Sequence, residues 1–255
     1  MMEYQTVKVR EQQQICFLQF YRPEANNTIN DRMAEECHHV LDRYEESAKI
    51  LVMEGLPDVF CFGADFQEMH DRMANGRQSE RNPGRLYDLW MRLATGPLLT
   101  ISHVRGKVNA GGIGFVAASD IVLAERTAQF SLSELLFGVF PAAVLPFLIR
   151  RTGTAKANYM TVMTKAISAE QAASWGLVDA CDDDSRSLLR KHLLRLKPLS
   201  KSAVVKYKRY MQRISEPLAQ AKPIAVKANL EMFSDPQNLT GIYWYIETGK
   251  FPWEE

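Results

Sequence analysis

The 255-residue sequence lacks an excess of charge of either sign and has few cysteines. Its 31 lysines and arginines stand against 30 aspartates and glutamates, which leaves a formal net charge of +1. This balance gives no reason to expect a nucleic-acid partner. The four cysteines (Cys16, Cys37, Cys61 and Cys181) are scattered, with no CxxC pair and no metal-ligand spacing. They predict reduced thiols in a cytoplasmic protein, and neither disulfides nor a bound metal.

Long hydrophobic runs and targeting signals are also missing. No apolar stretch approaches the roughly 20 residues that a membrane helix needs. The N-terminus does not have the pattern of a signal peptide, and the sequence has no long repeat or low-complexity tract. With 46% hydrophobic residues, the chain is long enough for one large domain, or two unequal ones, with an ample core. Because the sequence has no apolar run long enough for a membrane helix, we expect no membrane partner.

Strand-like apolar runs alternate with helical patterns along much of the chain. Strands are predicted over residues 6–10, 15–20, 50–54, 98–104 and 121–124. Helices are predicted from Asn30 or Asp31, over 66–95 with a polar break at 75–84, and at 116–118. This alternation predicts an α/β fold with a mostly parallel sheet.

The pattern changes after Pro146. Helices are predicted there over residues 168–175, 185–196, 200–213 and 217–233, with no strong strand. We therefore expect an α/β core over residues 1–195 and a helical region over residues 196–255.

Two glycine-bearing turns give the strongest functional signal. One runs from Phe60 to Phe66 and the other from Asn109 to Gly112, and each follows a predicted strand and precedes a possible helix start. Helix starts carry unpaired N–H groups and partial positive charge, and glycine allows close approach to the backbone. Taken singly, each turn is more often structural. Brought together, they predict an oxyanion hole, a site for charge that develops on a carbonyl oxygen.

Glu134 is a carboxylate among apolar neighbours. In the functional interpretation it is a general acid or base whose pKa is raised by desolvation. In the structural interpretation it begins a helix after Ser131 or Ser133 in a capping arrangement. The local sequence leaves both open, and the two glycine turns favour the functional one. Asp65, which directly follows Gly63 and Ala64 of the first turn, fits a helix cap better than a catalyst.

Other kinds of site find no support in the sequence. No His/Cys/Asp cluster indicates a metal, no serine lies in a GxSxG elbow, and no GxGxxG follows the first strand. The aromatic residues at 243–245 and 249–253 indicate packing between domains or subunits, with a lid over an acyl chain as the alternative.

The chain resembles the crotonase superfamily of enoyl-CoA hydratases and isomerases over nearly its whole length. The motifs that carry the resemblance are the Arg22 to Asn30 spacing, Gly63 to Asp65, Asn109 to Gly112, Asp120 to Ala124, the spacing of Ala128, Phe130, Glu134, Gly138 and Pro141, and Ile167 to Val178. The resemblance implies a spiral of ββα repeats with a helical C-terminal trimerisation region. It also implies an acyl-thioester substrate and no cofactor.

The resemblance also implies roles for individual residues. It places the two oxyanion-hole N–H groups at Ala64 and Gly111. Of the family's two catalytic glutamates, the second matches Glu134, whereas the first falls on Gly114, which cannot transfer a proton. This departure argues against ordinary two-glutamate hydration, and a single glutamate is similar to the double-bond isomerases. The implied substrate-binding residues are Phe62, Gly63, Asp65, Gly112 and Gly114.

Within the superfamily, the chain is most similar to the dehydratases of polyketide β-branching. That similarity implies dehydration of 3-hydroxy-3-methylglutaryl on the phosphopantetheine of an acyl carrier protein, with coenzyme A as the alternative carrier, by a homotrimer. The alternatives are an enoyl-CoA double-bond isomerase, the decarboxylating sister enzyme of the same pathway, and a catalytically weak scaffold.

The sequence leaves open two roles for cationic or hydrogen-bond-donating side chains. The substrate's free carboxylate needs a cation or several donors, and the sequence does not choose among its candidates, which are His70, Tyr87, Arg92 and Lys107. A second role concerns the cluster of Lys201, Lys206, Lys208 and Arg209. These side chains could bind the acidic surface of a carrier protein or the phosphates of a nucleotide, although a solvated helix face is the favoured interpretation.

Overall fold

Two β-sheets organise the computed structural model, which describes residues 3–74, 82–214 and 217–254. The first sheet has six strands in the order β1-β2-β3-β5-β7-β10, and the second has four in the order β4-β6-β8-β9. The strands are β1 (Val7–Gln12), β2 (Ile15–Phe20), β3 (Ile50–Glu54), β4 (Val59–Cys61), β5 (Leu99–Val104), β6 (Lys107–Asn109), β7 (Ile121–Glu125), β8 (Gln129–Ser131), β9 (Ile167–Ser168) and β10 (Ala180–Asp182).

The chain winds between the two sheets as a spiral. Strand β3 joins the first sheet and β4 the second, and a helical segment follows. The pairs β5/β6 and β7/β8 repeat this step. Neighbouring strands are parallel, apart from β1 with β2 and β8 with β9. The expected α/β spiral of ββα repeats is therefore confirmed.

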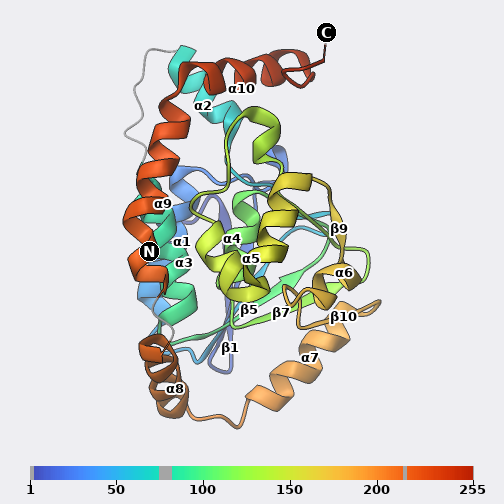
Figure 1. Ribbon diagram of the computed structural model, residues 1–255. Helices are drawn as coiled ribbons and strands as arrows, with labels where there is room; N and C mark the ends of the chain where they lie inside the picture. The colour runs from blue at the N-terminus through green and yellow to red at the C-terminus, as the bar shows by residue number, and fades with distance from the viewer. Residues whose placement is uncertain (1–2, 75–81, 215–216, 255) are drawn as a thin grey trace.

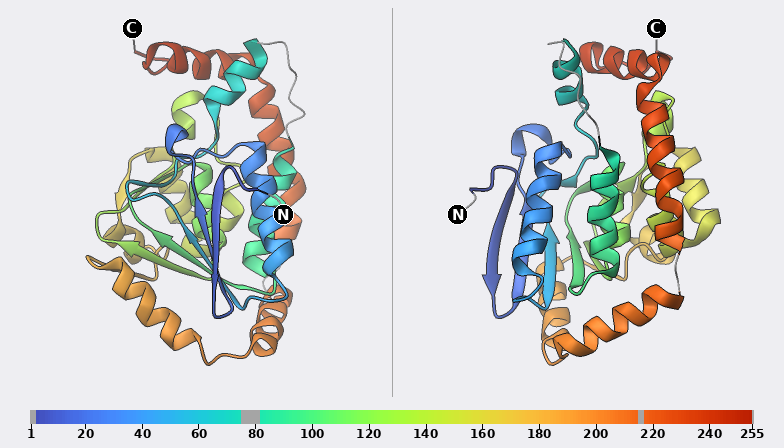
Figure 2. Two further views of the ribbon diagram at one scale, coloured as in Figure 1. Left: turned by 180° about the vertical axis from the view of Figure 1, so that it is seen from behind. Right: turned by 90° about the vertical axis from the view of Figure 1, so that its left-hand side faces the viewer.

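The helices lie in layers outside the first sheet. Figure 2 shows α1, α3 and α9 at increasing distance from β1, and α3 contacts α1, α4, α8 and α9. The helical segments are η1 (Pro23–Ala25), α1 (Asp31–Tyr44), α2 (Phe66–Ala74), α3 (Pro83–Thr95), α4 (Gly111–Ala118), η2 (Glu134–Phe137), α5 (Leu145–Met163), α6 (Ala169–Ser174), α7 (Ser185–Leu196), α8 (Lys201–Ile214), α9 (Pro217–Ser234) and α10 (Pro236–Thr248).

No strong strand was expected after Pro146, and two short strands are found there. Strand β10 adds to the edge of the first sheet, with Ala180 opposite Leu123 of β7, and β9 pairs with β8 in the second sheet. Both strands are only two or three residues long, which is too short for an alternating pattern to show in the sequence. Part of the predicted polar break, residues 75–81, lies outside the described residues.

The C-terminal helices pack onto the rest of the molecule. Leu218 and Ala225 of α9 belong to the main hydrophobic core. Tyr245 of α10 and Phe251 lie against Phe137 of η2, with ring centroids 5.1 and 5.6 Å from it, and α10 crosses the top of the view beside α2 (Figure 1). The aromatic C-terminal residues therefore pack against the segment that carries Glu134. None of the helices in the described ranges is long and apolar enough to cross a membrane.

Candidate active site

A cavity brings the predicted site residues together. It encloses about 170 Å³, many times the roughly 10–15 Å³ that one water molecule requires, so it can admit a ligand. Its lining includes Ala64, Gly111 and Glu134, together with Asp65, Arg85 and Trp90.

The two glycine turns touch each other at this cavity. A Cβ placed on Gly63 would lie 3.3 Å from the Gly111 nitrogen and 2.6 Å from the Ala110 Cβ, and Gly63 has a φ of +92°. Only glycine fits such a backbone without strain. The close approach places Ala64, the residue after Gly63, beside Gly111 at one wall of the cavity.

Both predicted donors are unpaired within the described part of the chain. Among the described residues, neither the Ala64 N–H nor the Gly111 N–H has a hydrogen-bond partner, whereas the adjacent Asp65 and Ala110 N–H groups bond to backbone carbonyls at 3.0 and 3.1 Å. Gly111 is also the first residue of α4, where the helix carries partial positive charge. The cavity wall therefore offers two backbone donors, which is what an oxyanion hole requires.

The backbone of Ala110 is strained between these donors. It has φ 49° and ψ −123°, a sparsely populated conformation for a residue with a Cβ. Asn109 holds this turn from behind, because its Nδ2 donates to Ser133 Oγ at 2.8 Å and its Oδ1 accepts from Ser131 Oγ at 2.9 Å. The same side chain therefore fixes both the oxyanion turn and the residue before Glu134. Sequence reasoning missed this link.

Glu134 lies in the cavity wall with most of its surface hidden. It is 9% exposed, and its Oε2 has no partner among the described residues. Burial raises its pKa to about 7, against a smaller lowering by the backbone N–H groups of Glu134 and Ser133. Glu134 begins the 3-10 helix η2, as the structural interpretation expected, but Ser133 makes no side-chain cap there. Glu134 is a carboxyl group suited to proton transfer near neutral pH.

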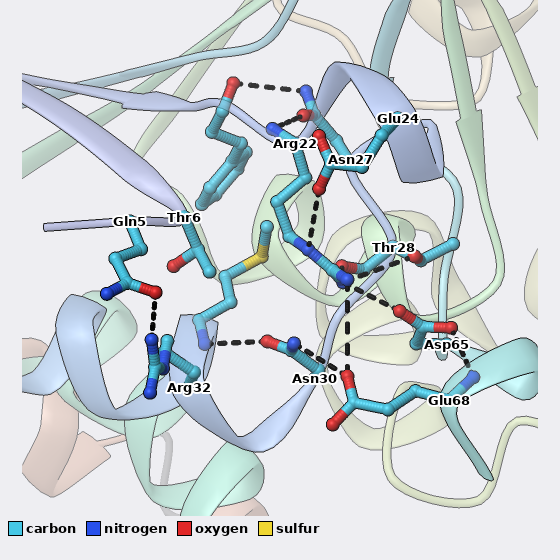
Figure 3. A network of polar contacts seen from close by, with 12 residues as sticks. Gln5, Thr6, Arg22, Glu24, Asn27, Thr28, Asn30, Arg32, Asp65 and Glu68 are labelled. Atoms are coloured by element: carbon cyan, nitrogen blue, oxygen red, sulfur yellow. Dashed lines mark hydrogen bonds and ion pairs between the residues drawn. The ribbon is translucent and has the colours of Figure 1, made fainter. Parts of the chain in front are cut away.

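A buried ion pair holds the Ala64 turn in place (Figure 3). Arg22 Nη1 lies 2.8 Å from Asp65 Oδ2 and donates to the Thr28 carbonyl at 2.6 Å. Asp65 Oδ1 accepts the Glu68 N–H at 2.9 Å and so caps α2. The expected capping role of Asp65 is confirmed, and both of its carboxylate oxygens are engaged within the protein.

The remaining predicted residues surround the cavity without being among the residues that line it. Phe62 is 41% exposed, and Gly63 lies behind the oxyanion turn. A Cβ on Gly112 would lie 2.3 Å from the Cys61 carbonyl oxygen. A Cβ on Gly114 would lie 2.4 Å from Trp90 Cζ2, so the indole fills the space in front of Gly114.

None of the four candidates for the substrate carboxylate is among the described lining residues. Tyr87 is buried and donates to the Leu218 carbonyl at 2.6 Å. Arg92 pairs with Asp42 and Glu45 at 2.7 and 3.0 Å.

Two members of the predicted basic cluster are engaged inside the protein. Lys208 is 3% exposed and pairs with Asp120 at 2.6 Å, and Lys201 donates to the carbonyls of Glu45 and Glu46. The interpretation of Lys208 as a surface cation is therefore wrong. Within the described ranges, no group of three or more His, Cys, Asp or Glu side chains is placed to hold a metal ion.

Known proteins resemble the chain in sequence and in fold. A profile of the enoyl-CoA hydratase/isomerase family matches residues 10–255. The chain is 59% identical over 253 residues to bacillaene synthase dehydratase PksH of Bacillus subtilis (strain 168), covering 99% of this chain and 98% of that protein. It is 27% identical over 230 residues to 2,3-dehydroadipyl-CoA hydratase of Escherichia coli (strain K12), covering 87% and 85%. The crystal structure of a polyketide biosynthesis enoyl-CoA hydratase (pksH) from Bacillus subtilis matches with a TM-score of 0.96 and 59% identity, over 98% of this chain and 100% of that chain.

Proposed function

Because the chain belongs to the enoyl-CoA hydratase/isomerase family and has the crotonase fold, we propose that it dehydrates 3-hydroxy-3-methylglutaryl-acyl carrier protein to 3-methylglutaconyl-acyl carrier protein in polyketide β-branching. The chain is an enzyme of the hydro-lyase class, and its 59% identical relative is a dehydratase of polyketide biosynthesis. One observation carries the proposal. A buried carboxyl group with a pKa of about 7 shares a cavity with two backbone N–H groups that have no hydrogen-bond partner among the described residues.

The first step forms an enolate. The thioester oxygen accepts hydrogen bonds from the Ala64 and Gly111 N–H groups while the Glu134 carboxylate removes a proton from C2. Negative charge then moves onto that oxygen, where each donor contributes roughly 2.7–4 kcal/mol of transition-state stabilisation. Since the donors belong to the backbone, the conformation of the two turns sets their positions.

The second step expels water. The Glu134 carboxylic acid returns its proton to the hydroxyl on C3, the C3–O bond breaks, and the enolate electrons form the C2–C3 double bond. One carboxyl group thus takes and gives the same proton, and its pKa of about 7 suits both tasks at neutral pH. Trp90 in front of Gly114 supports a mechanism with a single carboxylate, because the indole fills that space.

The carrier and the assembly are parts of the same proposal. The substrate arrives on the phosphopantetheine of an acyl carrier protein, and no cofactor takes part. Coenzyme A, which presents the same pantetheine arm, is the alternative carrier. We place the enzyme in the cytoplasm as a homotrimer, with residues 196–255 as the oligomerisation region.

The Glu134→Gln variant tests the proposed chemistry. An amide cannot take the C2 proton, so we expect kcat on 3-hydroxy-3-methylglutaryl-acyl carrier protein to fall by about 10²- to 10⁴-fold. Glu170→Gln, which changes an exposed glutamate, is the control and should keep full activity. Full activity of Glu134→Gln would contradict the assignment.

A further inference from the structure

We propose that Arg85 selects substrates that carry a free carboxylate at the far end of the acyl group. The inference depends on the proposed function, because it assigns the part of the cavity that meets the distal end of 3-hydroxy-3-methylglutaryl. It departs from the candidates that the sequence suggested, which are not among the residues lining the cavity.

The charges around the cavity single out Arg85. Among the described lining residues, Arg85 is the only cationic one. The carboxylates of the lining are Asp31, Asp65, Glu68 and Glu134. An anionic acyl group would be repelled by such a lining unless a cation met its charge. Arg22 cannot serve, since it is not among the lining residues and is already paired with Asp65.

The start of α3 adds to the positive charge of Arg85. Arg85 lies in the first turn of this helix, where the N-cap residue Asn82 makes no side-chain cap and the turn itself holds no acidic residue against the helix dipole. Asn82, Pro83 and Leu86 line the cavity beside it. The His38 ring bonds to the Arg85 carbonyl at 2.9 Å and ties this turn to α1.

The Arg85 side chain is available to a ligand. Its one ion pair among the described residues joins Nη1 to Glu35 Oε1 at 2.7 Å, and both side chains are 48% exposed. Such half-exposed pairs hold their partners weakly. A guanidinium has five N–H donors, so Arg85 can keep Glu35 and still present a fork of donors to a substrate carboxylate.

Arg92 provides a matched control. It lies two turns further along α3, pairs with Asp42 and Glu45, and is not among the residues that line the cavity. Replacing either arginine by methionine removes one positive charge from the same helix and keeps a long side chain. Only the change at Arg85 removes charge from the cavity wall.

The test compares two substrates on the same carrier protein. One is 3-hydroxy-3-methylglutaryl, and the other is its terminal carboxamide, which has the same size and no charge. For Arg85→Met we expect kcat/KM on the carboxylate to fall by about 10- to 100-fold, with less than about a threefold change on the carboxamide. Arg85→Lys should keep part of the preference, and Arg92→Met should match the wild type on both substrates.

Two results would overturn the inference. One is an equal loss on both substrates in Arg85→Met, and the other is an unchanged preference for the carboxylate. If the wild type dehydrates neither substrate, the proposed function has failed, and binding then decides the question for Arg85. In that case, 3-methylglutaryl-pantetheine should bind the wild type more tightly than its carboxamide does, and Arg85→Met should abolish the difference. Equal binding of the two by the wild type would contradict the inference.

Discussion

At the scale of single residues, burial decides the chemistry of Glu134. The carboxyl group is 9% exposed and one of its oxygens has no partner among the described residues, so its charged form loses water without a full replacement. The resulting pKa of about 7 serves proton transfer and also lowers stability at high pH.

The raised pKa of Glu134 predicts that the unfolding free energy of the protein depends on pH. The folded-state pKa of Glu134 is raised above the ordinary value of 4.5, so the folded state binds more protons than the unfolded state between these values. The stability that the folded state gains from this tighter proton binding is fully present below about pH 4.5 and is lost as the pH rises through about 7. Glu134→Gln, which cannot ionise, should therefore exceed the wild type by up to about 3 kcal/mol in unfolding free energy above pH 8.

Urea denaturation at about pH 5 and about pH 8.5 measures this difference. The advantage of Glu134→Gln should appear at the higher pH and largely disappear at the lower one, while Glu170→Gln shows neither effect. The same difference between Glu134→Gln and wild type at both pH values would contradict a raised pKa.

The sequence was enough to identify the candidate residues, but it did not show the contacts that surround each of them in the fold. Glu134 stood out because it is charged in an apolar segment, but Tyr245 and Phe251, which pack against Phe137 of the same η2 segment, come from a distant part of the chain. Ala110 gave no signal at all, since its positive φ is imposed by Asn109 and the neighbouring strand and is not a preference of alanine. Long-range contacts, which a local pattern does not record, set both environments.

At the scale of elements, the contact of α3 with α4 fixes the floor of the site. A Cβ on Gly114 would lie 2.4 to 2.7 Å from three indole atoms of Trp90, so Gly114→Ala must shift the indole or α4. We expect it to lower the unfolding free energy by about 1–3 kcal/mol.

A double-mutant cycle measures this coupling. The cost of Gly114→Ala should shrink in a Trp90→Leu background, because the smaller side chain leaves room for the added methyl group. Trp90→Leu alone serves as the reference for the cavity that it creates. Strictly additive costs in urea denaturation would show that the indole does not restrict position 114.

Element length decided which parts of the fold the sequence could predict. The strand at 15–20 has the predicted bounds, and α1 begins after Asn30, whose side chain accepts the Met33 N–H as expected of a cap. The short strands β4, β6, β8 and β9 were missed as strands from the residues alone, since two or three residues show no period. The second sheet was therefore expected only from the family resemblance.

At the scale of the whole molecule, apolar side chains remain on the surface of one chain. Tyr159, Val162 and Met163 near the end of α5 are 51%, 59% and 48% exposed, and grouped exposed apolar residues favour association. We expect light scattering to give three times the mass of one chain. A mass of one chain at micromolar concentration would contradict the proposed homotrimer.

The most direct measurement is intact-protein mass spectrometry of 3-hydroxy-3-methylglutaryl-acyl carrier protein after incubation with the enzyme. The proposed function predicts the loss of one water from the carrier, and a loss at least about 100-fold slower when Glu134→Gln replaces the wild type. Loss of carbon dioxide from a 3-methylglutaconyl-loaded carrier would instead indicate the decarboxylating sister enzyme. An unchanged mass with both substrates would contradict the proposal and favour an enoyl-CoA isomerase.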